Sequence, residues 1–350
     1  MNVTYIIGNG FDLNLGLKTS YYDFYDYYKN IPSPNEDIEN LKEDIKSNIN
    51  QWSDLEHRIG QYTSVFPDSG KRRMINIQLD LAKNLKNYLK GVSESMPITK
   101  GSGLLSLSDD IGNPNKYLTK RENKQLVEFY NSVNSSSSFI HIITLNYTSF
   151  IENLLGFQTG IVLDLQSSGF NGKTVSINKI LHLHEKLEGN ILIGVNDESQ
   201  IANEAFRTDP TLKEILIKPV ANQMFGTDVD EECESIIDST NLFVLFGVSL
   251  GDTDRKWWER IASRLQQDRA RMLIFHHDTN FEGAYLMGEE KRSVQEKFLE
   301  QTSLDQDWCK ALQERIFVAP NTNMFGKVRQ SILNSKGVTV SIKPNKIAKS

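Results

Sequence analysis

The sequence of 350 residues is short of cysteine, of excess positive charge and of long apolar runs. Its two cysteines, Cys233 and Cys309, lie far apart without a C-x-x-C pair, which excludes a disulfide framework and a four-cysteine zinc site within the chain. The formal net charge of -6 argues against nucleic acid as a partner, because coating nucleic acid requires a basic surface. No apolar stretch approaches the length of a membrane span, and the N-terminus lacks a signal-peptide pattern. We therefore expect a cytoplasmic protein without a membrane partner.

Short, nearly continuous apolar runs alternate with helical patterns after residue 135. Such runs are typical of parallel strands that helices cover on both faces. The predicted strands are 3–7, 139–144, 179–184, 190–195, 241–247 and 271–276. The predicted helices are 20–30, 148–155, 212–224, 229–239 and 253–268. The alternation predicts an α/β fold with a doubly wound, mostly parallel, Rossmann-like sheet.

The stretch from about residue 36 to 135 has helical patterning instead. It is broken by loops at 67–70 and 97–115. We predict an α/β domain formed by residues 1–35 and 136–325, with residues 36–135 as a large helical insertion. Residues 326–350 are expected to form one short helix and a basic tail.

A glycine-rich loop, GNGFDLNLG, follows the first predicted strand and runs from Gly8 to Gly16. Gly8 and Gly10 can take positive φ and let the backbone approach a diphosphate, while the next helix directs its amide groups at the anion. The spacing G-x-G-x5-G is longer than that of dehydrogenases, and the lysine of a phosphate loop is missing. A tight strand-to-helix turn without a ligand is the alternative.

Polar residues end three further predicted strands, in the segments 144–148, 182–185 and 247–254. In a doubly wound sheet these segments meet at one edge, facing the glycine loop. They suit cleavage of an N-glycosidic bond, in which nicotinamide leaves an oxocarbenium-like ribose. Asn146 has a donor and an acceptor for a ribose hydroxyl or an attacking water, and the imidazole of His184 is a suitable base.

Each of these residues also has a structural interpretation. His182 and His184 share one face of a strand, so they could pack in the core or bind a metal together. No carboxylate or cysteine pattern accompanies them, and we assign no metal ligand. Helix capping is the alternative for Asn146, Thr148, Ser249, Thr253 and Asp254.

Five segments of the chain resemble the bacteriophage abortive-infection family AbiH. They read IIGNGFDLNLGLKTSYYDF, WSDLE, TLNYTSFIENLLG, HLHEKLEGNILIGVND and FGVSLGDTDRKWW, and they occur in this order between residues 5 and about 265. The resemblance implies a protein of antiviral defence against phage. Within WSDLE, we expect Glu56 to be a surface acid beside a buried Trp52, with an indirect role at the nucleotide site as the alternative.

The same segments resemble, more distantly, the sirtuin-like NAD-binding fold. Segment 8–16 is similar in its glycine spacing, TLNY resembles the element that carries the sirtuin catalytic asparagine, and GVSL resembles a turn that contacts the adenosine ribose. The resemblance implies that Asn146 and His184 are catalytic. It implies NAD contacts from Gly8, Asn9, Gly10, Phe11, Asp12, Gly16, Thr144, Tyr147, Gly247, Ser249, Leu250 and Asp252.

The chain departs from the sirtuin pattern at several positions. Thr148 stands where an aspartate contacts the nicotinamide carboxamide, and Glu185 replaces the glycine after the histidine. The four zinc cysteines of the deacylases are absent, which favours a sirtuin-like NADase over a deacylase.

These observations predict an enzyme that hydrolyses NAD to ADP-ribose and nicotinamide, with NAD as substrate and no further cofactor. The first alternative is an NAD or ADP-ribose sensor that acts through a partner protein. The second is a metal-dependent hydrolase built on His182 and His184. A phage-derived trigger and a homo-oligomer are left open as partners.

Overall fold

The computed structural model describes residues 1–96, 98–267, 269–278 and 286–335. The described residues contain one sheet of seven strands in the order β3-β4-β2-β1-β5-β6-β7. Neighbouring strands run parallel, except that β3 is antiparallel to β4. The strands are β1 (Asn2–Ile7), β2 (Ser137–Thr144), β3 (Leu163–Gly169), β4 (Lys173–His182), β5 (Leu242–Phe246), β6 (Arg271–His276) and β7 (Ile316–Pro320). The prediction of an α/β chain with a mostly parallel sheet is confirmed.

Helices pack on both faces of this sheet. The apolar residues of one group join a cluster on the first face: α1 (Gly10–Asn14), α6 (Leu104–Gly112), α7 (Lys120–Ser132), α8 (Phe150–Leu155) and α16 (Gly326–Ser335). A second group joins a cluster on the other face: α12 (Val229–Ser239), α13 (Arg255–Gln266), α14 (Met287–Glu300) and α15 (Gln306–Gln313). The parallel strands are therefore buried on both sides, as their apolar runs predicted.

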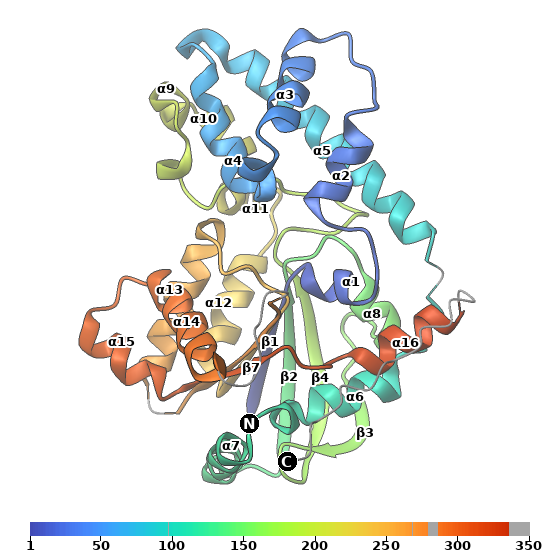
Figure 1. Cartoon of the computed structure of the whole chain (residues 1–350), viewed down its shortest axis with the longest axis vertical. Helices are drawn as coiled ribbons and strands as arrows, with labels where there is room; N and C mark the ends of the chain where they lie inside the picture. The colour runs from blue at the N-terminus through green and yellow to red at the C-terminus, as the bar shows by residue number, and fades with distance from the viewer. Residues whose placement is uncertain (97, 268, 279–285, 336–350) are drawn as a thin grey trace.

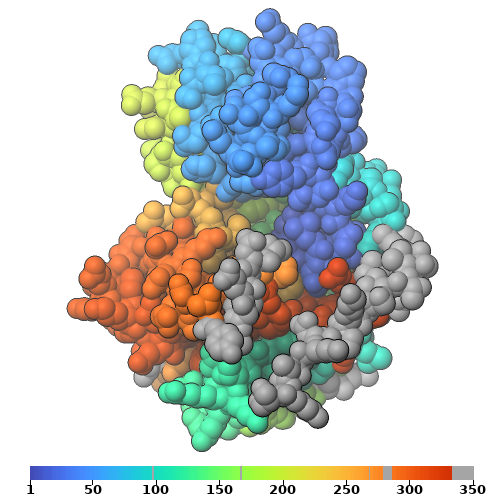
Figure 2. Space-filling view, viewed as in Figure 1, coloured from blue at the N-terminus to red at the C-terminus, as the bar shows by residue number. Residues whose placement is uncertain are grey.

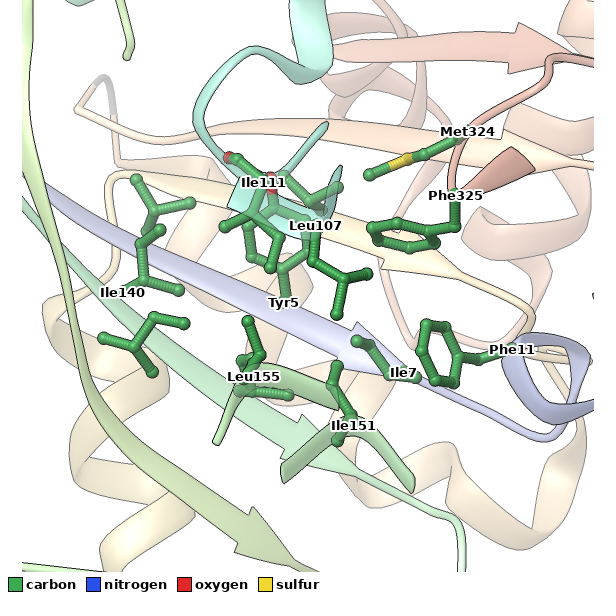
Figure 3. Close-up of a cluster of buried hydrophobic side chains, with 14 of the residues drawn as sticks. Tyr5, Ile7, Phe11, Leu107, Ile111, Ile140, Ile151, Leu155, Met324 and Phe325 are labelled. Carbon is green, nitrogen blue, oxygen red and sulfur yellow. Dashed lines mark hydrogen bonds between the residues drawn. The ribbon is translucent and has the colours of Figure 1, made fainter. Parts of the chain in front are cut away.

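The central strand β1 shows how the alternation of side chains builds the two layers. Tyr5 and Ile7 face the first cluster, whereas Ile6 faces the second. Figure 3 shows Tyr5 and Ile7 among apolar side chains of α6, α8 and the segment before α16. The Tyr5 hydroxyl donates to Ile111 O of α6 at 2.6 Å. This packing fixes the carboxyl end of β1, which lies beside the carboxyl ends of the neighbouring parallel strands.

A third apolar cluster belongs to a helical lobe, which we define as residues 21–94 and 191–224. The lobe stands above the carboxyl ends of the strands, and the molecule is narrower where the two parts meet (Figures 1 and 2). Its helices are α2 (Tyr21–Tyr28), α3 (Glu36–Ser47), α4 (Leu55–Tyr62), α5 (Lys71–Glu94), α9 (Glu204–Thr208), α10 (Pro210–Leu216) and α11 (Lys218–Met224).

Packing groups the chain differently from the predicted boundaries at residues 36 and 135. Helices α6 and α7 fall inside the expected insertion, yet their apolar residues pack on the sheet. The division into a domain of residues 1–35 and 136–325 with an insertion at 36–135 therefore remains a prediction. Helix α16 begins the expected C-terminal segment, and residues 336–350 of the predicted tail lie outside the described residues. No helix in the described ranges is long and apolar enough to cross a membrane.

The predicted strand at 190–195 is wrong. Val195 makes a single parallel bridge to Ile217, and Ile191 and Ile193 pack inside the helical lobe. The apolar run was a correct sign of burial, but its neighbours are helices rather than strands. At Gly194 an added Cβ would come within 2.3 Å of Leu216 O, so the segment lies directly against the end of α10.

Candidate functional site

The glycine loop packs directly on the loop that follows β5. Gly8 N–H donates to Phe246 O at 3.0 Å, and Gly10 N–H donates to Gly247 O at 2.9 Å. A Cβ on Gly10 would lie 2.4 Å from Gly247 Cα, and Gly247 has a φ of +68°. The glycines are thus needed for the close approach of two backbones. We expected amides free to bind a diphosphate, whereas those of Gly8 and Gly10 already bind carbonyl oxygens.

We expect Gly10→Ala to lower the free energy of unfolding by about 1–3 kcal/mol, because the added methyl group overlaps the backbone of Gly247. Gly91→Ala is the matched control. Gly91 lies in α5 with nothing within 4 Å of its Cβ position, and alanine favours a helix over glycine by about 1 kcal/mol. Denaturant unfolding of the three proteins measures both changes. Equal stability of the Gly10→Ala variant and the wild type would contradict the close approach.

Asp12, Asn146 and Thr148 form a buried polar group, the Asp12 cluster, where α1 meets the segment after β2. Asn146 Nδ2 donates to Asp12 Oδ1 at 3.1 Å, and Thr148 Oγ1 donates to Asp12 Oδ2 at 2.5 Å. The backbone N–H of Asn146 donates to Thr144 Oγ1 at 3.1 Å. Among the described residues, Asn146 Oδ1 has no hydrogen-bond partner although it is buried. One acceptor atom of this carboxamide is therefore left over.

Helix capping does not explain Asn146, Thr148 or Asp254. The N-cap of α8 is Ser149, and no side chain caps the helix there. Asp254 does occupy the N-cap position of α13, but it makes no side-chain cap hydrogen bond. Asn146 and Thr148 contact Asp12 instead, and Asp254 contacts a lysine and a histidine.

The electrostatic environment of Asp12 is unusual for a carboxyl group. Burial raises the pKa of Asp12 to about 7, and the negative charge of Glu152 adds to this rise. The hydrogen bonds from Thr148 and Asn146 act in the opposite direction but do not cancel it. Asp12 therefore changes its protonation state near neutral pH.

His182 and Glu152 support Asn146 from the other side. His182 Nδ1 lies 2.8 Å from Asn146 O, and His182 Nε2 lies 2.5 Å from Glu152 Oε1. Lys186 Nζ also donates to Glu152 Oε1, at 2.9 Å. Burial alone would raise the pKa of Glu152, but the hydrogen bonds and charges of His182 and Lys186 lower it to about 2. The hydrogen bonds of His182 thus link the backbone of the catalytic candidate to Glu152.

His184 belongs to a different group, the ionic cluster of Glu56, His184, Lys218 and Asp254. Lys218 Nζ lies 2.7 Å from Glu56 Oε2, 3.3 Å from Asp254 Oδ1 and 3.1 Å from His184 Nε2. His184 Nε2 lies 3.4 Å from Asp254 Oδ1, and His184 Nδ1 lies 3.8 Å from Glu56 Oε1. All four side chains are buried. The expectation that Glu56 is a surface acid is wrong.

The ionic cluster joins the helical lobe to the end of the sheet. Glu56 and Lys218 come from α4 and α11, whereas Asp254 ends a short 3-10 helix, η6 (Asp252–Asp254), after β5. Burial alone would lower the pKa of Lys218, but the charges of Asp254 and Glu56 raise it to about 12. Lys218 in turn holds the pKa of Asp254 well below its usual range, against the effect of burial.

Tyr147 connects the two groups of side chains. Its hydroxyl lies 2.7 Å from Leu192 O and 3.2 Å from Glu56 Oε1, and its ring centroid lies 6.3 Å from that of His184. Burial, with the nearby charge of Glu56, raises the pKa of Tyr147 well above its ordinary value. Asn146 and Tyr147 are adjacent in sequence, so the Asp12 cluster and the ionic cluster are neighbours at the same edge.

The remaining residues of the predicted NAD site differ in their surroundings. Asn9 is exposed, and its side chain exchanges two hydrogen bonds with Thr19, of 2.9 and 2.6 Å. Ser249 and Asp252 are also exposed, as is Gly16, which follows α1 with a φ of +84°. Phe11 and Leu250 pack in apolar clusters on opposite faces of the sheet. Those two side chains contribute packing at the loops.

The space beside the ionic cluster is small. One cavity there has a volume of about 10 Å³, about the space of a single water, and is lined by Leu183, His184, Asn196, Lys218, Pro219, Asn222, Asp230 and Trp257. Ligand pockets typically have about 300–1,000 Å³, so this cavity does not hold a dinucleotide without some opening. The described ranges contain no group of three or more His, Cys, Asp or Glu side chains arranged to bind a metal.

The predicted site did not include seven residues of these networks: Glu56, Thr148, Glu152, His182, Lys186, Lys218 and Asp254. For Glu152 a signal existed, because this acid follows Ile151 within the apolar pattern of a predicted helix. Lys218 precedes Pro219 in a segment without any motif. Only the three-dimensional arrangement brings Lys218 to Glu56, 162 positions away.

Comparison with known proteins supports the resemblance of the motifs. No curated protein matches the chain. The family model described as bacteriophage abortive infection AbiH matches residues 4–276, which include the Asp12 cluster and the ionic cluster. Since the match covers most of the sequence, the chain belongs to the AbiH family.

Proposed function

We propose that this AbiH-family protein hydrolyses NAD to ADP-ribose and nicotinamide as its contribution to abortive infection. One observation carries the proposal. The buried carboxamide of Asn146 is held through Nδ2 by Asp12, while its Oδ1 has no partner among the described residues. Buried polar atoms in proteins are nearly always hydrogen-bonded, so an unpaired acceptor suggests a ligand. A ribose hydroxyl or an attacking water would donate to this atom.

The sheet edge supports a dinucleotide lying across two loops. The glycine loop and the loop after β5 are in backbone contact, and each exposes a polar residue, Asn9 and Ser249. Ligands of parallel α/β sheets bind beyond the carboxyl ends of the strands. A diphosphate would therefore lie over these two loops and not on the amides of Gly8 and Gly10, which already donate to carbonyl oxygens. We include the sirtuin-like, doubly wound NAD-binding fold in this proposal.

Substrate entry requires the helical lobe to move relative to the sheet. Asn146 and His184 are both buried beneath the junction, and the nearby cavity is smaller than NAD needs. A resting protein of this kind spares the NAD of its own cell. A phage-derived trigger would then act by favouring the open arrangement.

NAD turnover by the purified protein tests the proposal, with and without extract from phage-infected cells as the trigger. We expect nicotinamide release by the wild type and a loss of about 10²–10³-fold in kcat for Asn146→Ala, comparable to the loss of one transition-state contact. Asn153→Ala on the exposed side of α8 is the matched control and should keep wild-type turnover. Equal turnover by Asn146→Ala, or no release under either condition, would refute the proposal.

The departures from the sirtuin pattern at Thr148 and Glu185 support a second candidate, an NAD or ADP-ribose sensor without hydrolysis. Such a sensor needs the loops to bind the ligand but does not need water at Asn146. Calorimetry distinguishes the two functions, since stoichiometric NAD binding without nicotinamide release would favour the sensor.

A further inference from the structure

We infer that Asp12 is the general base of this reaction, taking a proton from the water that Asn146 positions against the ribose. The inference rests on the proposed NAD hydrolysis and adds a catalytic residue to it. It assigns to Asp12 a chemical role, beyond the contact with NAD that its place in the glycine loop suggested.

The geometry of the Asp12 cluster carries this assignment. Asp12 Oδ1 accepts a hydrogen bond from Asn146 Nδ2, while the unpaired Oδ1 belongs to the same planar carboxamide. A water that donates one hydrogen to Asn146 Oδ1 is therefore separated from the Asp12 carboxylate only by the carboxamide group of Asn146. Its second hydrogen is then available to Asp12, which requires only a small displacement of the carboxylate from Asn146.

The protonation behaviour of Asp12 fits this role. Burial raises the pKa of Asp12 to about 7, which lies near the working pH where a general base is most effective. The charged group that acts on Asp12 is Glu152 of α8, whose carboxylate is paired with His182 and Lys186. The hydrogen bonds from Asn146 and Thr148 lower the pKa, so these two residues tune the base.

His184 is less suited to receive this proton. Its Nε2 lies 3.1 Å from Lys218 Nζ and 3.4 Å from Asp254 Oδ1, and its Nδ1 faces Glu56 at 3.8 Å. Nε2 is thus occupied by Lys218 within the ionic cluster, and Nδ1 lies at ion-pair distance from the carboxylate of Glu56. His184 belongs to the group of side chains that joins the helical lobe to the sheet.

The reaction balances with these residues alone. The water oxygen forms a bond to C1′ of the ribose as the bond from C1′ to the nicotinamide nitrogen breaks. The electron pair of the broken bond neutralises the pyridinium ring, and nicotinamide leaves as a neutral molecule. The proton of the water passes to Asp12 and from there to solvent, so one proton is released for each NAD hydrolysed.

The pH dependence of kcat tests the assignment. For the wild type we expect kcat to fall below about pH 7 as Asp12 becomes protonated. Asp12→Asn should reduce kcat at least ~10²-fold and remove this acidic limb. An asparagine at this position can still accept from Asn146 and donate to Thr148, so the variant keeps the shape of the cluster. Thr148→Val should move the limb to higher pH, because the hydrogen bond it removes lowers the pKa of Asp12.

The outcomes separate a failure of Asp12 as the general base from a failure of the proposed NAD hydrolysis. An Asp12→Asn protein with the wild-type kcat and limb overturns the role of Asp12 and leaves NAD hydrolysis intact. If that variant does not fold, an unchanged limb in Thr148→Val overturns it. A wild type that releases no nicotinamide contradicts both the reaction and the base. A purely structural Asp12 would change thermal stability without moving the acidic limb.

Discussion

Replacing Lys218 by methionine is expected to lower the free energy of unfolding at pH 7 by about 3–5 kcal/mol. Methionine has nearly the shape of lysine but no charge. The substitution leaves the carboxylates of Glu56 and Asp254 buried near each other without the ammonium group that lies 2.7 and 3.3 Å from them. Breaking a buried ion pair by removing one partner is costly because the remaining charge cannot return to water.

Lys46→Met is the matched control for this experiment. Lys46 pairs with Glu43 on the exposed surface of α3, and pairs of this kind contribute about 0–1 kcal/mol. Denaturant unfolding at pH 7 compares the two variants with the wild type. A loss below about 1 kcal/mol for Lys218→Met would contradict the tight ionic cluster described above.

The pH dependence gives a second check on Lys218. The pKa of Asp254 is held below its usual range, so its contribution to stability is present above its unfolded pKa and is lost as pH falls through the folded value. The difference between Lys218→Met and the wild type should therefore shrink toward pH 4, where the unpaired carboxylates can take up protons. The double variant Glu56→Gln, Lys218→Met should recover part of the loss at pH 7.

Replacing Asp12 by asparagine is expected to stabilise the protein at pH 8 by up to about 4 kcal/mol. The pKa of Asp12 is raised from 3.8 to about 7 in the folded protein, and one pKa unit corresponds to about 1.4 kcal/mol. Below pH 3.8 the group is neutral in both states and has no effect. Between pH 4 and 7 it ionises only when unfolded, which favours unfolding, and above pH 7 the full cost is present.

The gain should accordingly be near zero at pH 4 and grow as the pH rises to 8. Asp26→Asn is the control, because Asp26 is exposed and its pKa is lowered by Lys29. This control should show no gain that grows with pH. A stability of Asp12→Asn that stays parallel to the wild type from pH 4 to pH 8 would contradict a buried, weakly acidic Asp12.

Much of the sheet could be predicted because its strands are buried on both faces. The apolar runs predict β1, β2, β5 and β6 closely, whereas the run at 179–184 overlaps only the second half of β4, which ends at His182. β3 is an edge strand with the polar sequence LDLQSSG, so it has no apolar pattern to find. β7, a short strand that ends in Pro320, was not predicted either. At 190–195 burial among helices gave the same signal as burial in a sheet.

The helices predicted after residue 135 and at 20–30 also correspond to observed helices, with one exception at 212–224. Predictions at 20–30, 148–155, 229–239 and 253–268 correspond to α2, α8, α12 and α13. The single helix predicted at 212–224 is two helices, because Ile217 has an extended backbone with a φ of -111° and a ψ of 110°. Pro219 follows two residues later and favours a new helix start. This break places Lys218 at the first position of α11, facing the ionic cluster.

The candidate site was predictable as a location but not as a network. Strand ends and glycines indicated one edge, and the structure brings Asn146 to Asp12 there. The sequence gives no indication that Asp12 binds Thr148, since the two are 136 positions apart. Nor do local patterns reveal which histidine faces which acid. Those pairings depend on how the helical lobe sits over the sheet.

The position of β1 in the sheet has a consequence for folding during synthesis. This first strand lies in the middle of the sheet, and its two neighbours, β2 and β5, are made only when synthesis reaches residues 144 and 246. Ribosomes add about 5–20 residues per second, so β1 waits roughly 10–50 s for its second partner. During this time its row of backbone amides and carbonyls is open to wrong pairing. We therefore expect β1 to be the strand most exposed to wrong pairing while the chain is being synthesised.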